Sequence, residues 1–173
     1  MPIETEASFK LNDRTALITG PCNSINQAIA MRMTQVGANV VFVDKNTDQA
    51  SRFASQLMDA REINERYGRA AAIQGDLSAP DRIQDTISRV AEVFGGIDIY
   101  IDGQTQLDVQ PFQNITALEN LDAMIGVNLK APLLTTHAVL KFLSARKRGR
   151  VIYLIHDICR LGMPQNGLLS ATR

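Results

Sequence analysis

The turn at positions 19–30, TGPCNSINQAIA, contains the residues best suited to bind a nucleotide. It follows an apolar run and precedes a helical pattern, so Gly20 lies where a first strand would lead into a first helix. At such a turn the pyrophosphate of a dinucleotide binds to backbone amides at the helix N-terminus, and glycines let the backbone approach it closely. Only Gly20 is present of the three glycines expected.

A carboxylate stands at the end of the second apolar run. Asp44 follows the run at 39–43, where it could accept hydrogen bonds from the hydroxyls of an adenine ribose. The same charge would repel a 2′-phosphate, which favours NAD over NADP. The alternative is an exposed turn aspartate without a ligand.

The elements that would position these residues follow from the hydrophobic pattern. Apolar, β-branched runs alternate with helical patterns, which is typical of a parallel sheet covered by helices. Gly37 is placed to end the first helix, and Ser78 is a candidate N-cap for a helix that starts near Ala79. We predict five strands, at 15–19, 39–43, 70–74, 97–101 and 150–155.

The longest predicted helix covers residues 117–145 and contains a proline. Pro132 has no N–H, so the carbonyl of Asn128 would lose its helical partner and the helix should bend there. This bend predicts a polar pocket in the middle of the helix.

Composition excludes several classes of protein. The chain has 173 residues, with 18 basic and 18 acidic side chains, so its formal charge is zero and a nucleic-acid or membrane-surface partner is not expected. No apolar run is long enough to span a membrane, and the N-terminus does not resemble an export signal, so we expect a cytoplasmic protein. Two isolated cysteines and two histidines do not form a metal motif, and no metal is expected.

From the glycine turn onward the sequence resembles the short-chain dehydrogenase/reductase family. The family turn reads TGxxxGxG: Gly20 matches it, Ser24 replaces the second glycine and Asn26 the third. The Ser24-Ile25 pair partly matches enoyl-reductase-like members, so the resemblance implies Gly20, Ser24 and Ile25 as cofactor contacts. A Cβ at position 24 and an amide at position 26 would crowd the pyrophosphate, so weak NAD binding is expected.

Two further segments carry the resemblance. Asp76, in GDLS, matches the aspartate that contacts the adenine ring in the family, although a carboxylate at a helix entry is the alternative. The segment FGGIDIYIDGQT matches the family pattern FGGIDILVNNAG up to Ile101. Asp102, Gly103, Gln104 and Thr105 then replace Asn-Asn-Ala-Gly, which puts the nicotinamide side of the site in question.

The resemblance also implies a catalytic tetrad of Asn, Ser, Tyr and Lys. Asn128 matches the asparagine, but Asp157 stands at the serine position, Leu169 at the tyrosine position and Arg173 at the lysine position. An ionised aspartate can only accept hydrogen bonds, so Asp157 loses the serine's role unless burial keeps it protonated. Leucine offers no proton to a carbonyl oxygen, and an arginine keeps its charge but cannot relay protons. The candidate catalytic residues are therefore Asn128, Asp157 and Arg173.

The prediction is a single Rossmann-like domain of the α/β class over residues 1–173. It is a doubly wound parallel sheet of about five strands in order 3-2-1-4-5, without the family's usual C-terminal strands. The function expected first is a degenerate dehydrogenase with weak or absent NAD binding and a regulatory or interaction role. The alternatives are an active NAD-dependent oxidoreductase that acts on a small carbonyl or alcohol through an altered site, and a lyase or hydratase that uses Asp157.

Two smaller expectations complete the analysis. Tyr153 and Arg160 have the spacing that some enoyl reductases use for tyrosine and lysine, but Tyr153 lies within the fifth predicted strand, which favours packing. That strand is wholly apolar and would lie at a sheet edge, where unpaired backbone groups invite another chain. We therefore expect a homo-oligomer, most simply a two-fold dimer, with a small molecule as a further candidate partner.

Overall fold

The computed structural model describes residues 10–107, 112–114, 118–162 and 164–173. Five parallel strands form one sheet in the order β3-β2-β1-β4-β5, which confirms the predicted order. The strands are β1 (Thr15–Thr19), β2 (Asn39–Asp44), β3 (Ala70–Gln74), β4 (Ile99–Asp102) and β5 (Arg150–Tyr153). β5 is an edge strand of this sheet, as predicted.

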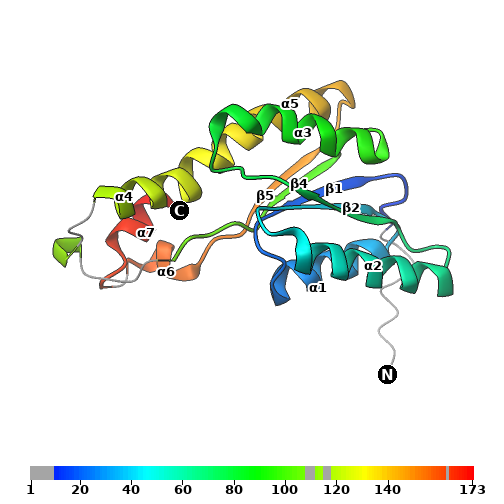
Figure 1. The fold of residues 1–173 in the computed structure, drawn as a ribbon, viewed down its shortest axis with the longest axis horizontal. Coiled ribbons are helices and arrows are strands. Elements are labelled where there is room, and N and C mark those ends of the chain that lie inside the picture. Colours follow the sequence, from blue (N-terminus) through cyan, green and yellow to red (C-terminus); the bar gives the residue numbers. More distant parts are fainter. Residues whose placement is uncertain (1–9, 108–111, 115–117, 163) are drawn as a thin grey trace.

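Helices cover both faces of the sheet. α1 (Ser24–Gln35) and α2 (Thr47–Ile63) lie on one face, and α3 (Pro80–Phe94) and α5 (Ala131–Ala145) lie on the other (Figure 1). The central strands supply both cores because successive residues of a strand point to opposite faces. Leu17 and Val41 belong to the α3/α5 core, whereas Ile18 and Phe42 belong to the α1/α2 core.

Several local predictions need correction. Ser78 is not the N-cap of α3: the N-cap is Ala79, and Ser78 instead donates hydrogen bonds from its N–H and its hydroxyl to Asp76. β4 begins at Ile99 rather than at position 97, and β5 ends at Tyr153 rather than at position 155. Gly37 does end the first helix, in the left-handed conformation that suits a glycine.

The long helix predicted at 117–145 is divided in two. α4 (Leu118–Ile125) leads into a π-helical turn, η2 (Gly126–Lys130), and α5 continues from Ala131. The N–H of Ala131 donates to the carbonyl of Gly126, five residues earlier, so the helix widens one residue before Pro132. A single π turn of this kind is common at functional sites and here contains Asn128. Position 117, the predicted start, lies outside the described residues.

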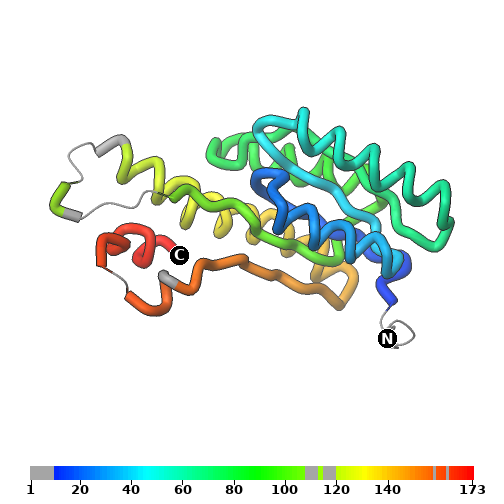
Figure 2. Tube along the Cα trace, turned by 90° about the horizontal axis from the view of Figure 1, so that it is seen from below, coloured from blue at the N-terminus to red at the C-terminus, as the bar shows by residue number. Residues whose placement is uncertain are grey.

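The C-terminal segment packs beyond the end of the sheet. α6 (Asp157–Leu161) and α7 (Gly167–Thr172) follow β5, and α7 lies beside α4, away from α1 and α2 (Figure 2). A short 3-10 turn, η1 (Phe112–Asn114), precedes α4. Within the described ranges, no helix has both the length and the apolar character needed to cross a bilayer.

Candidate functional site

The C-terminal ends of the central strands meet in one row. Thr19, at the end of β1, is in register with Val43 of β2 on one side and with Asp102 of β4 on the other. Asp102 is in register with Tyr153 of β5. In open α/β sheets a ligand binds outside the carboxyl ends of the strands, where the strand order reverses, and here β1 lies between β2 and β4. This edge is therefore the candidate site.

Arg173, the predicted cation of the tetrad, does not face an open site. Its guanidinium forms an ion pair with Asp102, and both side chains are only 2 % exposed. A second guanidinium nitrogen, Nη2, donates to Thr105 Oγ1 at 2.8 Å. The other carboxylate oxygen of Asp102 accepts from Thr19 Oγ1 at 3.1 Å. Two of the three guanidinium nitrogens thus contact groups within the protein, and the buried Nε has no hydrogen-bond partner among the described residues.

Asn128 lies at the predicted bend, and its side chain is also occupied. Its Oδ1 accepts from the N–H of Gln106 at 2.8 Å, and its Nδ2 donates to the carbonyl of Gln106 at 2.9 Å. Nδ2 also lies 3.4 Å from Thr172 Oγ1 in α7. Asn128 and Arg173 are therefore brought to the same region, because α7 contacts η2 and ends at the tip of β4.

Leu169, at the tyrosine position, is fully buried. It packs with Met124 of α4 and Leu168 of α7 in a small apolar cluster separate from the two main cores. Leu121 and Cys159 complete the cluster at its edge. The position that would present a proton donor thus serves the packing of α7 on α4.

Asp157 does not join the site. It is the first residue of α6, where its carboxylate accepts from Arg160 Nε at 3.1 Å and pairs with Arg160 Nη2 at 3.0 Å. Both side chains of this pair are 70 % exposed. Asp157 is therefore exposed, and its carboxylate is paired with Arg160. Its role as a catalytic partner of Asn128 and Arg173 stays a prediction.

The glycine turn lies between β1 and α1 as expected, but its side chains and caps differ from those of the family turn. Gly20 has φ +98°, and a Cβ there would lie 2.6 Å from the backbone of Gln104, so only glycine fits. Ser24 and Ile25 are exposed residues of the first turn of α1. The N–H of Asn26 donates to the side chain of Asn23 at 3.0 Å, so a donor of the helix N-terminus is already capped.

Asn26 is buried against the end of β4. Its Nδ2 donates to the carbonyl of Pro21 at 2.8 Å. A Cβ built on Gly103 would lie 2.3 Å from Asn26 Oδ1 and 2.5 Å from Nδ2. The side chain of Asn26 therefore fits sterically between helix and strand because the facing residue is a glycine, although its buried Oδ1 has no hydrogen-bond partner among the described residues.

The adenosine end keeps one of its two carboxylates available. Asp44 is partly exposed and accepts from the N–H of Asn46 at 3.2 Å. Asp76 is held more firmly: it accepts from Ser78, and Lys45 Nζ lies 2.9 Å from its second oxygen. The hydrogen bonds from Ser78 lower the pKa of Asp76, and Lys45 lowers it further. Asp76 thus serves as a local cap whose partners are Ser78 and Lys45.

These contacts test whether a nicotinamide dinucleotide fits the residues present. Asp44 suits an adenine ribose, because it keeps a partly exposed carboxylate at the end of β2. The capped helix N-terminus and the buried Asn26 suit a pyrophosphate poorly. At the nicotinamide end the residues do not fit, because Arg173 is paired internally with Asp102.

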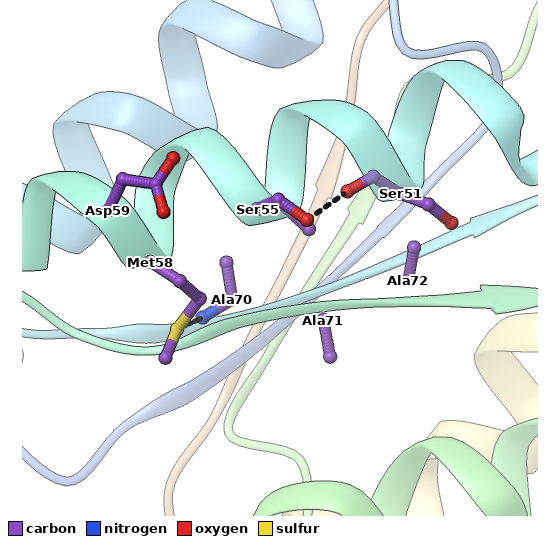
Figure 3. A pocket seen from close by; sticks show the side chains of 8 residues that line it. Ser51, Ser55, Met58, Asp59, Ala70, Ala71 and Ala72 are labelled. Carbon is purple, nitrogen blue, oxygen red and sulfur yellow. Dashed lines mark hydrogen bonds between the residues drawn. The ribbon is translucent and has the colours of Figure 1, made fainter.

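Two cavities lie away from this edge. One of about 340 Å³ is between α2 and the edge strand β3, where Ser55 and Met58 lie on the same side of the strand as Ala70 and Ala72 (Figure 3). Another of about 510 Å³ is lined by residues of α1, β4 and β5, among them Ile29, Ile101 and Ile152. Of the described residues that line these cavities, none is a predicted site residue.

Tyr153 has the packing role that its strand position favours. Its ring meets the ring of Tyr100 edge to face with centroids 6.4 Å apart, and its hydroxyl is hydrogen-bonded to Thr136 Oγ1. Tyr100 is buried, which raises the pKa of its phenol. A buried phenol of that kind is a poor proton donor at neutral pH.

Comparison with known proteins places this geometry in a family. The family model described as short chain dehydrogenase matches residues 14–173. The chain belongs to the short-chain dehydrogenase family. A galactitol 2-dehydrogenase of Agrobacterium fabrum is 31 % identical over 155 residues, which cover 89 % of this chain and 57 % of the relative. A sorbitol dehydrogenase of Cereibacter sphaeroides is 28 % identical over 95 % of this chain and 61 % of its own length.

Solved structures of short-chain dehydrogenases share the fold. A metagenomic short-chain oxidoreductase in complex with NADP superposes with a TM-score of 0.83 at 26 % identity, over 94 % of this chain and 71 % of that one. The chain spans 57 % and 61 % of the length of the two sugar-alcohol dehydrogenases.

Single-residue reasoning missed the partners of the site residues. Asp102 and Thr105 hold Arg173, and Gln106 holds Asn128. The sequence did contain a signal, because the replacement at position 102 introduces a negative charge where position 173 keeps a positive one. The reason for the two replacements becomes clear only in the structure, where the side chains of residues 102 and 173 are in contact.

Proposed function

We propose that this chain is a degenerate short-chain dehydrogenase domain that lacks ordinary hydride-transfer activity. It binds nicotinamide dinucleotides weakly or not at all, prefers NAD to NADP through Asp44, and serves as a regulatory or interaction module. The observation that supports this most directly is the burial of Leu169 at the tyrosine position, in an apolar cluster with Met124 and Leu168. Reduction of a carbonyl needs a general acid near the oxygen, and leucine has no proton to give.

Two further observations support the same conclusion. Arg173 is committed to Asp102 and Thr105, and Asp157 is exposed and paired with Arg160. A positioned general acid typically contributes about 10²- to 10⁴-fold to a rate, so its loss alone makes turnover slow. The names of the relatives favour a second candidate, an active oxidoreductase on a small polyol or ketone with an altered site.

Turnover separates the two candidates. We expect no measurable oxidation of NADH with a panel of small ketones, and no reduction of NAD with secondary alcohols and sugar alcohols. Turnover of several per second with any of them would refute the degenerate reading and support the active enzyme.

Binding provides an independent test. Because the adenosine end keeps Asp44 whereas the pyrophosphate turn is capped, AMP and NAD should bind with similar, weak affinity. An intact helix N-terminus would make the dinucleotide clearly tighter. Calorimetric titration of AMP, NAD and NADP measures this. Micromolar NAD binding with far weaker AMP binding would contradict the proposal.

A further inference from the structure

In two contacts at the C-terminal edge of the sheet, both residues differ from the family pattern. In the first, position 102 has aspartate where the family pattern has asparagine, and position 173 has arginine where it has lysine. In the second, position 26 has asparagine where the pattern has glycine, and position 103 has glycine where it has asparagine. Each replacement meets the other member of its own pair.

The first pair is matched in charge and in shape. Asp102 and Arg173 are both 2 % exposed, so either charge alone would be buried without a counterion. The planar guanidinium reaches Asp102 and Thr105 from two different nitrogens, which the single ammonium of a lysine does less well. Thr19 satisfies the second carboxylate oxygen. The pair thus connects the last residue of the structure to the ends of β1 and β4.

The second pair is matched in volume. Asn26 is 1 % exposed and lies against Gly103, where a Cβ would approach three of its side-chain atoms to between 2.3 and 2.7 Å. Contacts that short do not occur, so a side chain at 103 would force Asn26 to move. Relative to the family pattern, the asparagine lies on the helix rather than the strand, and the glycine lies on the strand side rather than on the helix.

We propose that the two replacements within each pair depend on each other, and that together they fill the C-terminal edge of the sheet with contacts inside the protein. In the first pair Arg173 is the buried counterion of Asp102 and anchors α7 to the sheet. The inference deepens the proposed function, since it assigns Arg173 to the protein interior rather than to a ribose. Its test measures stability rather than nucleotide binding, so either proposal can fail without the other.

A double-mutant cycle tests the first pair. Urea unfolding is measured for Asp102→Asn, Arg173→Met and the double variant. We expect each single change to raise the unfolding equilibrium constant by roughly 100-fold or more, because it leaves one buried charge unpaired. The double variant should lose less stability than the two single variants together. Its unfolding equilibrium constant should be at least about tenfold lower than the two single effects multiplied together would give, which corresponds to about 1.4 kcal/mol.

The chain offers a matched control. Asp157 and Arg160 form an ion pair of the same residue types whose side chains are 70 % exposed. The cycle of Asp157→Asn and Arg160→Met should show coupling of less than about threefold. Additive effects at positions 102 and 173, equal to those of the control, would overturn the proposal.

Arg173→Lys provides a second measurement if a charge-removing variant does not fold. It keeps the charge but loses the two-nitrogen contact, so amide hydrogen exchange in α7 should become at least tenfold faster while β1 to β3 stay protected. Unchanged exchange in α7 would count against the anchor.

The second pair is tested by exchange of volume. Gly103→Ala should lower the stability of the folded protein strongly in the natural background. It should lower the stability much less in an Asn26→Gly background, where the obstructing amide is absent. We expect at least a tenfold difference between the two effects on the unfolding equilibrium constant. Gly167→Ala is the control, because a Cβ there meets nothing within 4 Å. Equal effects of Gly103→Ala in both backgrounds would refute the coupling.

Discussion

Restoring the missing phenol gives a direct test of how far the site has changed. If only the proton donor were lost, Leu169→Tyr would raise ketone reduction by about 10²-fold or more, the typical contribution of a general acid. We expect no rise, because residue 169 is fully buried among Met124 and Leu168 and does not open toward a substrate.

The cost of this change follows from the packing. A phenol ring at position 169 would overfill the cluster at about 1–3 kcal/mol, and its buried hydroxyl would cost about 1–3 kcal/mol more without a partner. Together these reach about 2–6 kcal/mol, a large part of the stability of an ordinary domain. Urea unfolding should show this loss. Leu161→Tyr, at a leucine that is 59 % exposed in α6, should change stability by less than about 0.5 kcal/mol.

The assay is NADH oxidation with the ketone panel, measured for the natural chain and both variants at a temperature where all are folded. A 100-fold gain specific to Leu169→Tyr, with stability unchanged, would show that the cluster opens easily and that the reasoning from burial is wrong.

Two other predictions concern charge and assembly. The pKa of Asp76 is lowered in the folded protein, so its contacts should stabilise the fold above the unfolded carboxyl pKa of about 3.9 and lose this effect as the pH falls through the lower, folded value. Asp76→Asn should therefore be less stable than the natural chain at pH 7, and the difference should shrink in urea titrations as the pH falls from about 3.9 through the lower, folded value; a constant difference would contradict this. We also expect a two-fold dimer that uses the outer face of α5 or the β5 edge, where Leu140 is 45 % exposed and Ile152 is 43 % exposed. Leu140→Lys should raise the monomer fraction in light scattering, and a natural chain that is monomeric at high micromolar concentration would refute the dimer.

The fold could be predicted because its signals are local and repeated. Uninterrupted apolar runs such as 40–43 mark strands buried on both faces, and the sheet in the structure is parallel in the expected order. The first and last residues of the helices and strands could be predicted less accurately. Ser78 has the residue type of an N-cap, but the carboxylate of Asp76 two residues earlier competes for its N–H and hydroxyl. The π turn before Pro132 was predicted only as a bend, since the missing donor does not specify how the helix rearranges.

The candidate site could be predicted only in part. The positions of Gly20, Asn128 and Arg173 at one edge of the sheet follow from topology, because the C-terminal ends of parallel strands meet there. The partners did not follow, because Arg173 and Asp102 are 71 positions apart and each replacement, taken alone, reads as a loss. The surroundings of Asp157 did not follow for a different reason: the chain turns into α6 at this residue and exposes the side chain at a helix N-terminus.

The presence of Asn128 is compatible with a site that has lost its chemistry. Its amide makes two hydrogen bonds to the backbone of Gln106, a segment that leads away from β4 without the partners of a regular strand. Removing that amide would leave a partly buried N–H and carbonyl of Gln106 unpaired, at a cost of up to about 1–3 kcal/mol for each group. The π turn that presents Asn128 is therefore explained by the structural need of the chain after β4. The match at Asn128 alone is therefore weak evidence for catalysis. The buried Leu169 and the internal ion pair of Arg173 are stronger evidence against it, because each removes a group that hydride transfer requires.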